Sequence, residues 1–251
     1  PAAVVRAWSP AAVPARACVR SGTGSARAAA ASERAARTAA PEFFADLVRA
    51  VVARDRGRVS QWERWNEPDH PHSWSGGLDQ YVRLILEPGA DVVRTEAPEC
   101  SVLLGGLADH RNLALIHRAG GASLYDVASV HHYPSRASVR HVRRAVNHVR
   151  SVAGDEGRPD RGPRAVWLTE CGIASRPPTI PGSFGGTTDE PVQARFVRSL
   201  YATVEAEAIF LYQLRDTTIF DCHGRKLKEV YWGLTTSDSS RRKAAFATYR
   251  D

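Results

Sequence analysis

Two glutamates that each follow a short apolar run are the residues of this 251-residue sequence best placed to do chemistry. Glu67 lies in a Trp-Asn-Glu-Pro run directly after an aromatic, strand-like segment, and Glu170 lies in a Leu-Thr-Glu-Cys-Gly run after a second such segment. A carboxyl group acts as an acid when it is protonated and as a base or nucleophile when it is ionised. The two runs therefore suggest paired acid/base chemistry at two strand ends.

The histidines and cysteines form no recognisable metal or redox motif. No helical His-Glu-x-x-His pair organises the histidines, and no two cysteines have Cys-x-x-Cys spacing. The residues concerned are His70, His72, His110, His117, His223, Cys18, Cys100, Cys171 and Cys222. We interpret Cys171, beside Glu170, as a small buried residue rather than a reactive thiol. We therefore expect neither a metal nor another cofactor.

The composition is that of an ordinary globular protein. Apolar residues make up 43% of the chain and charged residues 24%, and no apolar run approaches the ~18 residues of a membrane-spanning helix. The net charge is +7, but the basic residues are almost all arginine and are spread along the chain instead of clustered. We therefore expect no nucleic acid and no membrane as partners, and the length suits a single domain.

The first 40 residues differ from the rest of the chain. Residues 1–40 are rich in Ala and Arg and are interpreted as an irregular, low-complexity segment, with one strand-like piece at residues 4–7. The chain opens on Pro1, contains no methionine and shows no signal-peptide pattern. We interpret it as a fragment, for which an extracellular location is favoured if a signal peptide lies upstream.

From residue 41 onward, short apolar runs alternate with amphipathic helical patterns. Helices are predicted from Pro41 to just before Gly57, at 79–94 with an interruption or kink at Pro88, and at 113–118, 139–152, 191–206 and after Ser240. Strands are predicted at 59–65, 101–104, 125–130, 165–168 and 208–212. This alternation is typical of βαβ units with a parallel sheet.

Polar residues or glycines follow each of these predicted strands. Such residues at the carboxyl ends of parallel strands are typical of the active-site face of a (β/α)8 barrel. A doubly wound open sheet also binds ligands there, but it normally shows a Gly-rich phosphate loop after an early strand, and the sequence has none. The sequence therefore favours an α/β fold of the (β/α)8 TIM-barrel type.

Four motifs, taken in order, resemble those of clan A glycoside hydrolases, most like the family 39 and related family 5 enzymes. They are Trp-Asn-Glu-Pro at 65–68, Gly-Gly-Leu at 105–107, Ser-Val-His-His-Tyr-Pro at 129–134 and Leu-Thr-Glu-Cys-Gly at 168–172. The resemblance covers residues 41–235. It implies an eight-stranded barrel in which Glu67 ends strand 4 and Glu170 ends strand 7, so that residues 41–251 would supply strands 4 to 8.

This resemblance implies a retaining glycosidase that cleaves β-O-glycosidic bonds of oligo- or polysaccharides. Glu67 would be the general acid/base and Glu170 the nucleophile, because the glycosidic oxygen must be protonated to leave while the oxocarbenium-like transition state needs an anion beside it. Retention by double displacement requires the two carboxyl groups to lie about 5–5.5 Å apart. Carbohydrate is the partner that the resemblance implies.

The resemblance also implies roles for the polar neighbours of the two glutamates. Asn66 would bind the sugar 2-hydroxyl. His131 and Tyr133 match the His-x-Tyr pattern that lines the sugar site after strand 6, and the Tyr133 phenol would orient the Glu170 carboxylate.

Aromatic rings can cover the apolar side of a pyranose ring. Trp74 and Tyr212 are our candidates for such sugar-binding rings, and Trp232 could act in the same way. Each of the three could equally lie in the core or at the rim of the site.

The sequence departs from the family pattern at its beginning. Strands 1 and 2 of the barrel have no counterpart, and neither has the basic residue that the family often places after strand 2. We expect this chain alone to be marginally stable, since an open wall of strands leaves unpaired edges. The alternative to an enzyme is a catalytically inactive barrel fragment or a saccharide-binding pseudoenzyme. The presence of both glutamates argues against that alternative, because a binding module does not need them.

Overall fold

The computed structural model describes residues 3–6, 41–154, 163–176, 189–217 and 231–250. The chain divides into two compact units, residues 1–130 with 149–166 and residues 131–148 with 167–251, which we describe in turn. Strands β4 (Val127–His132) and β5 (Ala165–Cys171) and helix α6 (Val139–Ala153) each contribute residues to both units. In the described part of the chain, no helix has the length and apolar character needed to cross a membrane.

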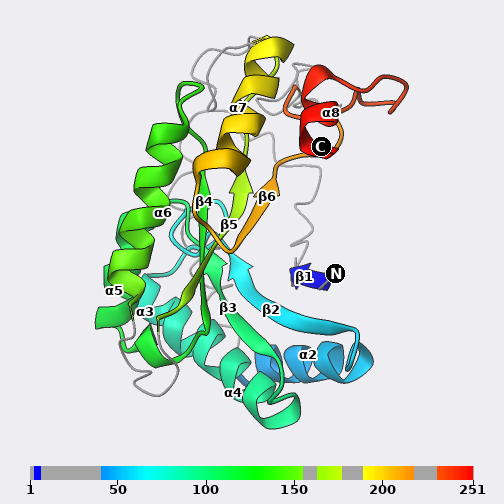
Figure 1. Cartoon of the computed structure of the whole chain (residues 1–251). Helices are drawn as coiled ribbons and strands as arrows, with labels where there is room; N and C mark the ends of the chain where they lie inside the picture. The colour runs from blue at the N-terminus through cyan, green and yellow to red at the C-terminus, as the bar shows by residue number, and fades with distance from the viewer. Residues whose placement is uncertain (1–2, 7–40, 155–162, 177–188, 218–230, 251) are drawn as a thin grey trace, which may run out of the picture. The chain divides into compact units, whose positions relative to one another are not determined.

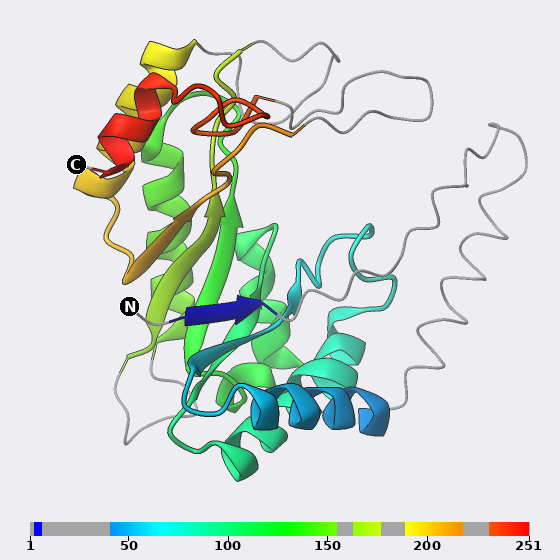
Figure 2. The ribbon, with the colours of Figure 1, turned by 90° about the vertical axis from the view of Figure 1, so that its right-hand side faces the viewer.

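The first unit is built on parallel strands. Strand β1 (Ala3–Arg6) pairs with β2 (Val59–Asn66), β2 with β3 (Ser101–Gly106), and β3 with β4, each in parallel. Figure 2 shows β1 lying beside β2. The strands predicted at 59–65 and 101–104 are confirmed, and β3 continues for two further residues, through the glycines that were expected to follow it. Apart from residues 3–6, the predicted segment 1–40 lies outside the described residues.

Helices α2 (Pro41–Arg54) and α4 (Glu87–Glu96) pack against each other in this unit (Figure 1). Helix α2 opens on a proline and buries Phe44, Val48 and Val52, which are four residues apart and so lie on one face. Helix α5 (Leu113–Arg118) has the predicted bounds. The helical periodicity of the sequence therefore predicted these elements correctly.

The predicted helix at 79–94 is helical throughout but contains a wider turn. It consists of α3 (Leu78–Tyr81), a π-helical segment (Val82–Leu86) and α4, and Pro88 lies in the first turn of α4. Proline has no N–H to donate to the carbonyl four residues earlier. The turn before it is accordingly wider, and the N–H of Glu87 bonds to the carbonyl of Val82, five residues back. The expected interruption is thus an expanded turn just before Pro88.

Two arginines are buried in the first unit, and they differ in how many hydrogen bonds their guanidinium groups make. The guanidinium of Arg164 donates to the carbonyls of Ala153 at 2.7 Å and Tyr125 at 3.3 Å, and also to that of Ala122. Arg64 is 1% exposed, and its Nε and Nη2 have no hydrogen-bond partner among the described residues. Burial lowers the pKa of Arg64 to about 10. The burial of Arg64 therefore lowers the free energy of unfolding.

The second unit contains the ends of β4 and β5, strand β6 (Ala208–Leu211) and helices α7 (Glu190–Thr203) and α8 (Ala244–Arg250). Strand β5 pairs in parallel with β6. Helices α7 and α8 lie side by side (Figure 1), and their core is formed by Val197, Leu234 and Ala245. Helix α7 starts at the predicted place, where Asp189 caps it by accepting from the N–H of Val192 at 2.7 Å. Parallel strands alternating with helices confirm the predicted α/β class.

Candidate active site

Glu67 follows β2 at a point where the backbone adopts unusual angles. Trp65 has φ 78° and Glu67 has φ 43°, which places two non-glycine residues in the left-handed region on either side of Asn66. Such angles carry a cost on the order of 1–3 kcal/mol each and persist only where neighbouring structure fixes them. Here β3 helps to fix the backbone, because the N–H of Glu67 donates to the carbonyl of Gly106 at 3.0 Å.

Tyr81, at the end of α3, also holds the backbone at the end of β2. Its buried hydroxyl donates to the carbonyl of Arg64 at 2.7 Å and accepts from the N–H of Gly105 at 3.1 Å. A Cβ on Gly105 would lie 2.5 Å from the Arg64 carbonyl oxygen and 3.0 Å from that of Trp65. The glycine at this position is therefore required, because β2 and β3 approach too closely for a side chain.

Asp69 ties the loop after Glu67 to the loop after β3. Its carboxylate accepts from the N–H groups of Ala108 at 2.9 Å and Asp109 at 2.8 Å, and from the Asn112 side chain at 3.0 Å. Three donors on one carboxylate leave little freedom to the segment that carries Glu67. The Asn-Glu-Pro-Asp stretch is thus anchored at both ends.

Trp74 is largely buried. It retains 9% of its exposure, packs edge-to-face against Trp65 with ring centroids 5.8 Å apart, and donates its indole N–H to the carbonyl of Gly77 at 3.1 Å. Trp65 donates in the same way to Ser73 at 3.0 Å. These contacts give Trp74 a packing role, and its sugar-binding role stays a prediction.

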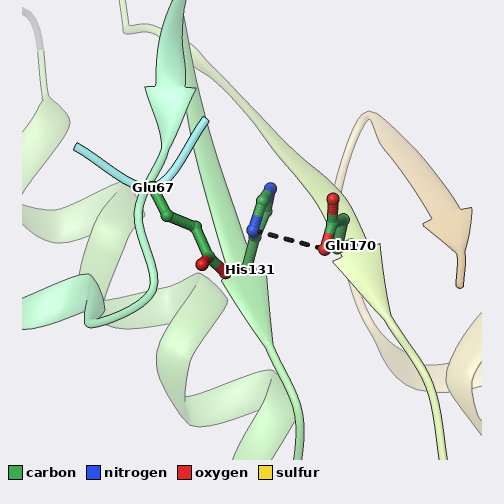
Figure 3. Close-up of side chains that lie close together, drawn as sticks. All are labelled: Glu67, His131 and Glu170. Atoms are coloured by element: carbon green, nitrogen blue, oxygen red, sulfur yellow. Dashed lines mark ion pairs between the residues drawn. The ribbon is translucent and has the colours of Figure 1, made fainter. Parts of the chain in front are cut away.

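Glu170 lies near the end of β5 and is contacted by two of the predicted site residues. The hydroxyl of Tyr133 donates to Oε2 of Glu170 at 2.5 Å. The same oxygen lies 3.5 Å from Nδ1 of His131, the contact drawn as a dashed line in Figure 3. His131 is 1% exposed, whereas the side chain of Glu170 keeps 17%. The phenol and the imidazole therefore restrict the direction of a carboxylate that is still open to solvent.

Tyr133, which bonds to Glu170, belongs to an aromatic cluster. The ring of Tyr133 lies 4.9 Å from Trp232 and 6.1 Å from Tyr212, centroid to centroid, with both contacts edge-to-face. Trp232 is 4% exposed and Tyr212 is partly exposed. Trp232 is therefore the buried ring that packs against both tyrosines, and Tyr212 keeps surface to offer a ligand.

The glycine of the Thr-Glu-Cys-Gly motif is explained by these neighbours. A Cβ on Gly172 would lie 2.2 Å from the carbonyl oxygen of Tyr212 and 3.1 Å from Cε3 of Trp232. The N–H of Tyr212 in turn donates to the carbonyl of Cys171 at 2.8 Å. Only glycine lets the backbone of Tyr212 and the ring of Trp232 come this close to position 172.

The structure thus brings four of the predicted site residues together in the second unit: Glu170, His131, Tyr133 and Tyr212. Asn66 and Glu67 are consecutive in the first unit, where Trp74 packs on their neighbour Trp65. Glu67 belongs to a part of the chain whose strained backbone is held by at least three separate hydrogen-bonding groups. Such strain is concentrated at functional sites.

Sequence reasoning missed the polar residues that hold the aromatic cluster, namely Gln193, Asp216 and Lys243. Each is at least partly buried and bonds to the backbone of Tyr231, Trp232 or Gly233. Lys243 stands in an Arg-Arg-Lys run that resembles a solvated surface. No signal in the sequence distinguishes this lysine from its exposed neighbours.

Three solved structures illustrate what the chain is similar to. A family 39 glycoside hydrolase from Bacteroides cellulosilyticus WH2 matches with a TM-score of 0.59 and 19% identity, over 82% of this chain and 43% of that enzyme. The GH39 enzyme from Xanthomonas axonopodis pv. citri matches with 0.59 and 17% identity, over 84% and 44%. A glucosidase from Croceicoccus marinus matches with 0.64 and 19%, over 84% and 45%.

The similarity is one of fold. No protein-family model and no curated protein sequence matches the chain. The chain spans less than half the length of each of these three enzymes. The predicted relationship is nevertheless confirmed at this level: the chain shares the fold of glycoside hydrolases.

Proposed function

We propose that the chain carries the catalytic residues of a retaining glycosidase that cleaves β-O-glycosidic bonds of oligo- or polysaccharides. The proposal includes a (β/α)8 barrel, to which the described strands would contribute strands 3 to 8. The observation that carries it is the environment of Glu170, whose Oε2 accepts from Tyr133 at 2.5 Å and lies 3.5 Å from Nδ1 of His131. The fold shared with glycoside hydrolases supports it.

The first half of the reaction forms a covalent intermediate. The Glu170 carboxylate attacks the anomeric carbon, and the bond to the glycosidic oxygen breaks as Glu67 delivers its proton to that oxygen. Tyr133 would keep the attacking oxygen aimed at the sugar, since its hydroxyl bonds to Oε2. The saccharide fragment that carries the protonated oxygen leaves as an alcohol.

The second half releases the sugar. Glu67, now a carboxylate, takes a proton from a water molecule, and the oxygen of that water attacks the anomeric carbon and displaces Glu170. Two inversions give net retention. Asn66 would bind the 2-hydroxyl during both steps, and the partly exposed ring of Tyr212 would lie against the apolar side of the sugar.

Chemical rescue tests both assignments in the full-length protein. In Glu170→Ala, turnover of an aryl β-glycoside should disappear, and azide should restore it with an inverted glycosyl azide as product. In Glu67→Ala, azide should give the retained product, and substrates with good leaving groups should suffer least, since they need no proton. Glu42→Ala, an exposed change on α2, is the matched control. Wild-type turnover in Glu170→Ala would refute the proposal.

A further inference from the structure

A buried ion pair lies next to the aromatic cluster of the second unit. Nζ of Lys243 is 2.6 Å from Oδ1 of Asp216, and the two side chains keep only 3% and 9% of their exposure. Burial lowers the pKa of Lys243, and Asp216 opposes that shift. Removing two charges from water costs desolvation free energy, so we expect a role of this pair beyond packing.

Both charges hold the backbone around Trp232. Lys243 donates to the Oγ of Ser175 at 2.9 Å and to the carbonyl of Tyr231 at 3.5 Å, while Asp216 accepts from the N–H of Gly233 at 2.8 Å. The residues on either side of the tryptophan are therefore fixed by one ion pair. Ser175 strengthens the hold, because its N–H also donates to Tyr231 at 2.9 Å.

The position of Trp232 determines what the tyrosines can do. Its ring packs 4.9 Å from that of Tyr133 and 6.2 Å from that of Tyr212, centroid to centroid. With its ring at this place, Tyr133 donates to Glu170. A continuous series of contacts therefore joins the ion pair to the Glu170 carboxylate through Trp232 and Tyr133.

We propose that Asp216 and Lys243 are positioning residues for Glu170: they lock Trp232 as the support that holds the Tyr133 hydroxyl on the carboxylate. The catalytic part of this inference rests on the proposed function, whereas the structural hold on Trp232 does not. Their bonds reach Ser175, Tyr231 and Gly233, so we expect the two residues to act on Glu170 through Trp232 and Tyr133.

The test follows Trp232 and turnover separately in the full-length protein. With 5-fluorotryptophan incorporated, the fluorine resonance of Trp232 is assigned by its loss in Trp232→Phe. In Lys243→Met this resonance should shift or broaden, and kcat should fall by roughly 10-fold or more while KM changes by less than about 3-fold, the pattern for a group that acts in the transition state.

Two further variants keep the test decisive. Asp216→Asn/Lys243→Met replaces both charges by neutral side chains of similar size, which a fold tolerates better than one unpaired charge, and it should show the same two effects. Arg49→Met breaks an exposed ion pair with Asp46 on α2, away from Lys243 in the sequence, and should change neither readout.

The outcomes separate the two proposals. An unchanged Trp232 resonance, or an unchanged kcat despite a shifted resonance, overturns the positioning role. If the wild-type protein shows no glycosidase activity, the proposed function fails and the catalytic part of this inference falls with it. A shifted resonance would then still support the structural hold on Trp232.

Discussion

The hydroxyl of Tyr133 donates a hydrogen bond to Oε2 of Glu170 over 2.5 Å, and thereby joins the end of β4 to the end of β5. The ring that carries this hydroxyl is supported by Trp232 and Tyr212. The Tyr133 hydroxyl therefore orients the Glu170 carboxylate. Its solvent exposure of 17% leaves it accessible.

Tyr133→Phe removes the hydroxyl and keeps the ring in its cluster. A hydrogen bond to a charged group contributes about 1.5–3 kcal/mol, so kcat toward an aryl β-glycoside should fall roughly 10- to 100-fold. Steady-state kinetics measures the loss, and an unchanged thermal melt shows that the fold is intact. Wild-type kcat in this variant would mean that the hydrogen bond does not serve the reaction.

Tyr81→Phe should destabilise the strained end of β2. The change leaves the carbonyl of Arg64 and the N–H of Gly105 without their shared partner, at about 1–3 kcal/mol for each buried group. The free energy of unfolding, measured in urea, should therefore fall by at least ~2 kcal/mol. In Tyr201→Phe the lost hydroxyl is on a side chain that is 42% exposed, and the change should be ~0.5 kcal/mol or less. Equal effects of the two substitutions would contradict this account of β2.

The two buried arginines should respond in opposite ways to methionine. Arg164→Met leaves three carbonyls of the first unit without their donor and should cost at least ~2 kcal/mol of unfolding free energy. Arg64→Met removes a buried charge whose Nε and Nη2 have no described partner, and should be neutral or stabilising. Chemical denaturation of both variants gives the comparison. A large loss of stability in Arg64→Met would contradict this, because it would mean that the guanidinium makes strongly stabilising contacts.

The two described free cysteines should differ in reactivity. Cys171 is fully buried, and burial raises the pKa of its thiol, whereas Cys100 is partly exposed. Thiolate is the reactive form, so iodoacetamide at neutral pH should modify Cys100 and spare Cys171 until denaturant is added. Peptide mass spectrometry reads both sites. Rapid modification of Cys171 in the folded protein would contradict its interpretation as a buried structural residue.

Much of this fold could be predicted from the sequence because apolar spacing reports burial directly. The helix at Pro41–Arg54 and the strand at Ala208–Leu211 follow from such spacing, within one or two residues. The bounds of β3 were harder, since Gly105 and Gly106 suggest a turn. Both glycines continue the strand, and at Gly105 the backbone of β2 passes too close for any side chain.

The surroundings of the glutamates were less accessible to sequence reasoning. The pairing of Tyr133 with Glu170 was expected from the resemblance, and the structure shows that contact. The left-handed backbone of Trp65 and Glu67 had no signal, because neither residue type favours that region. Burial of Lys243 depends on Asp216, which is distant in sequence, and long-range pairing of this kind has no local pattern.

The central claim is that Glu170 is a nucleophile, and covalent trapping tests it most directly. The full-length protein is incubated with a 2-deoxy-2-fluoro β-glycoside that carries an activated leaving group, and the labelled peptide is identified by mass spectrometry. We predict one fluoroglycosyl group per chain, attached to Glu170 and absent from Glu170→Ala. A label on any other residue, or no label at all in a protein that turns over the parent glycoside, would contradict the assignment.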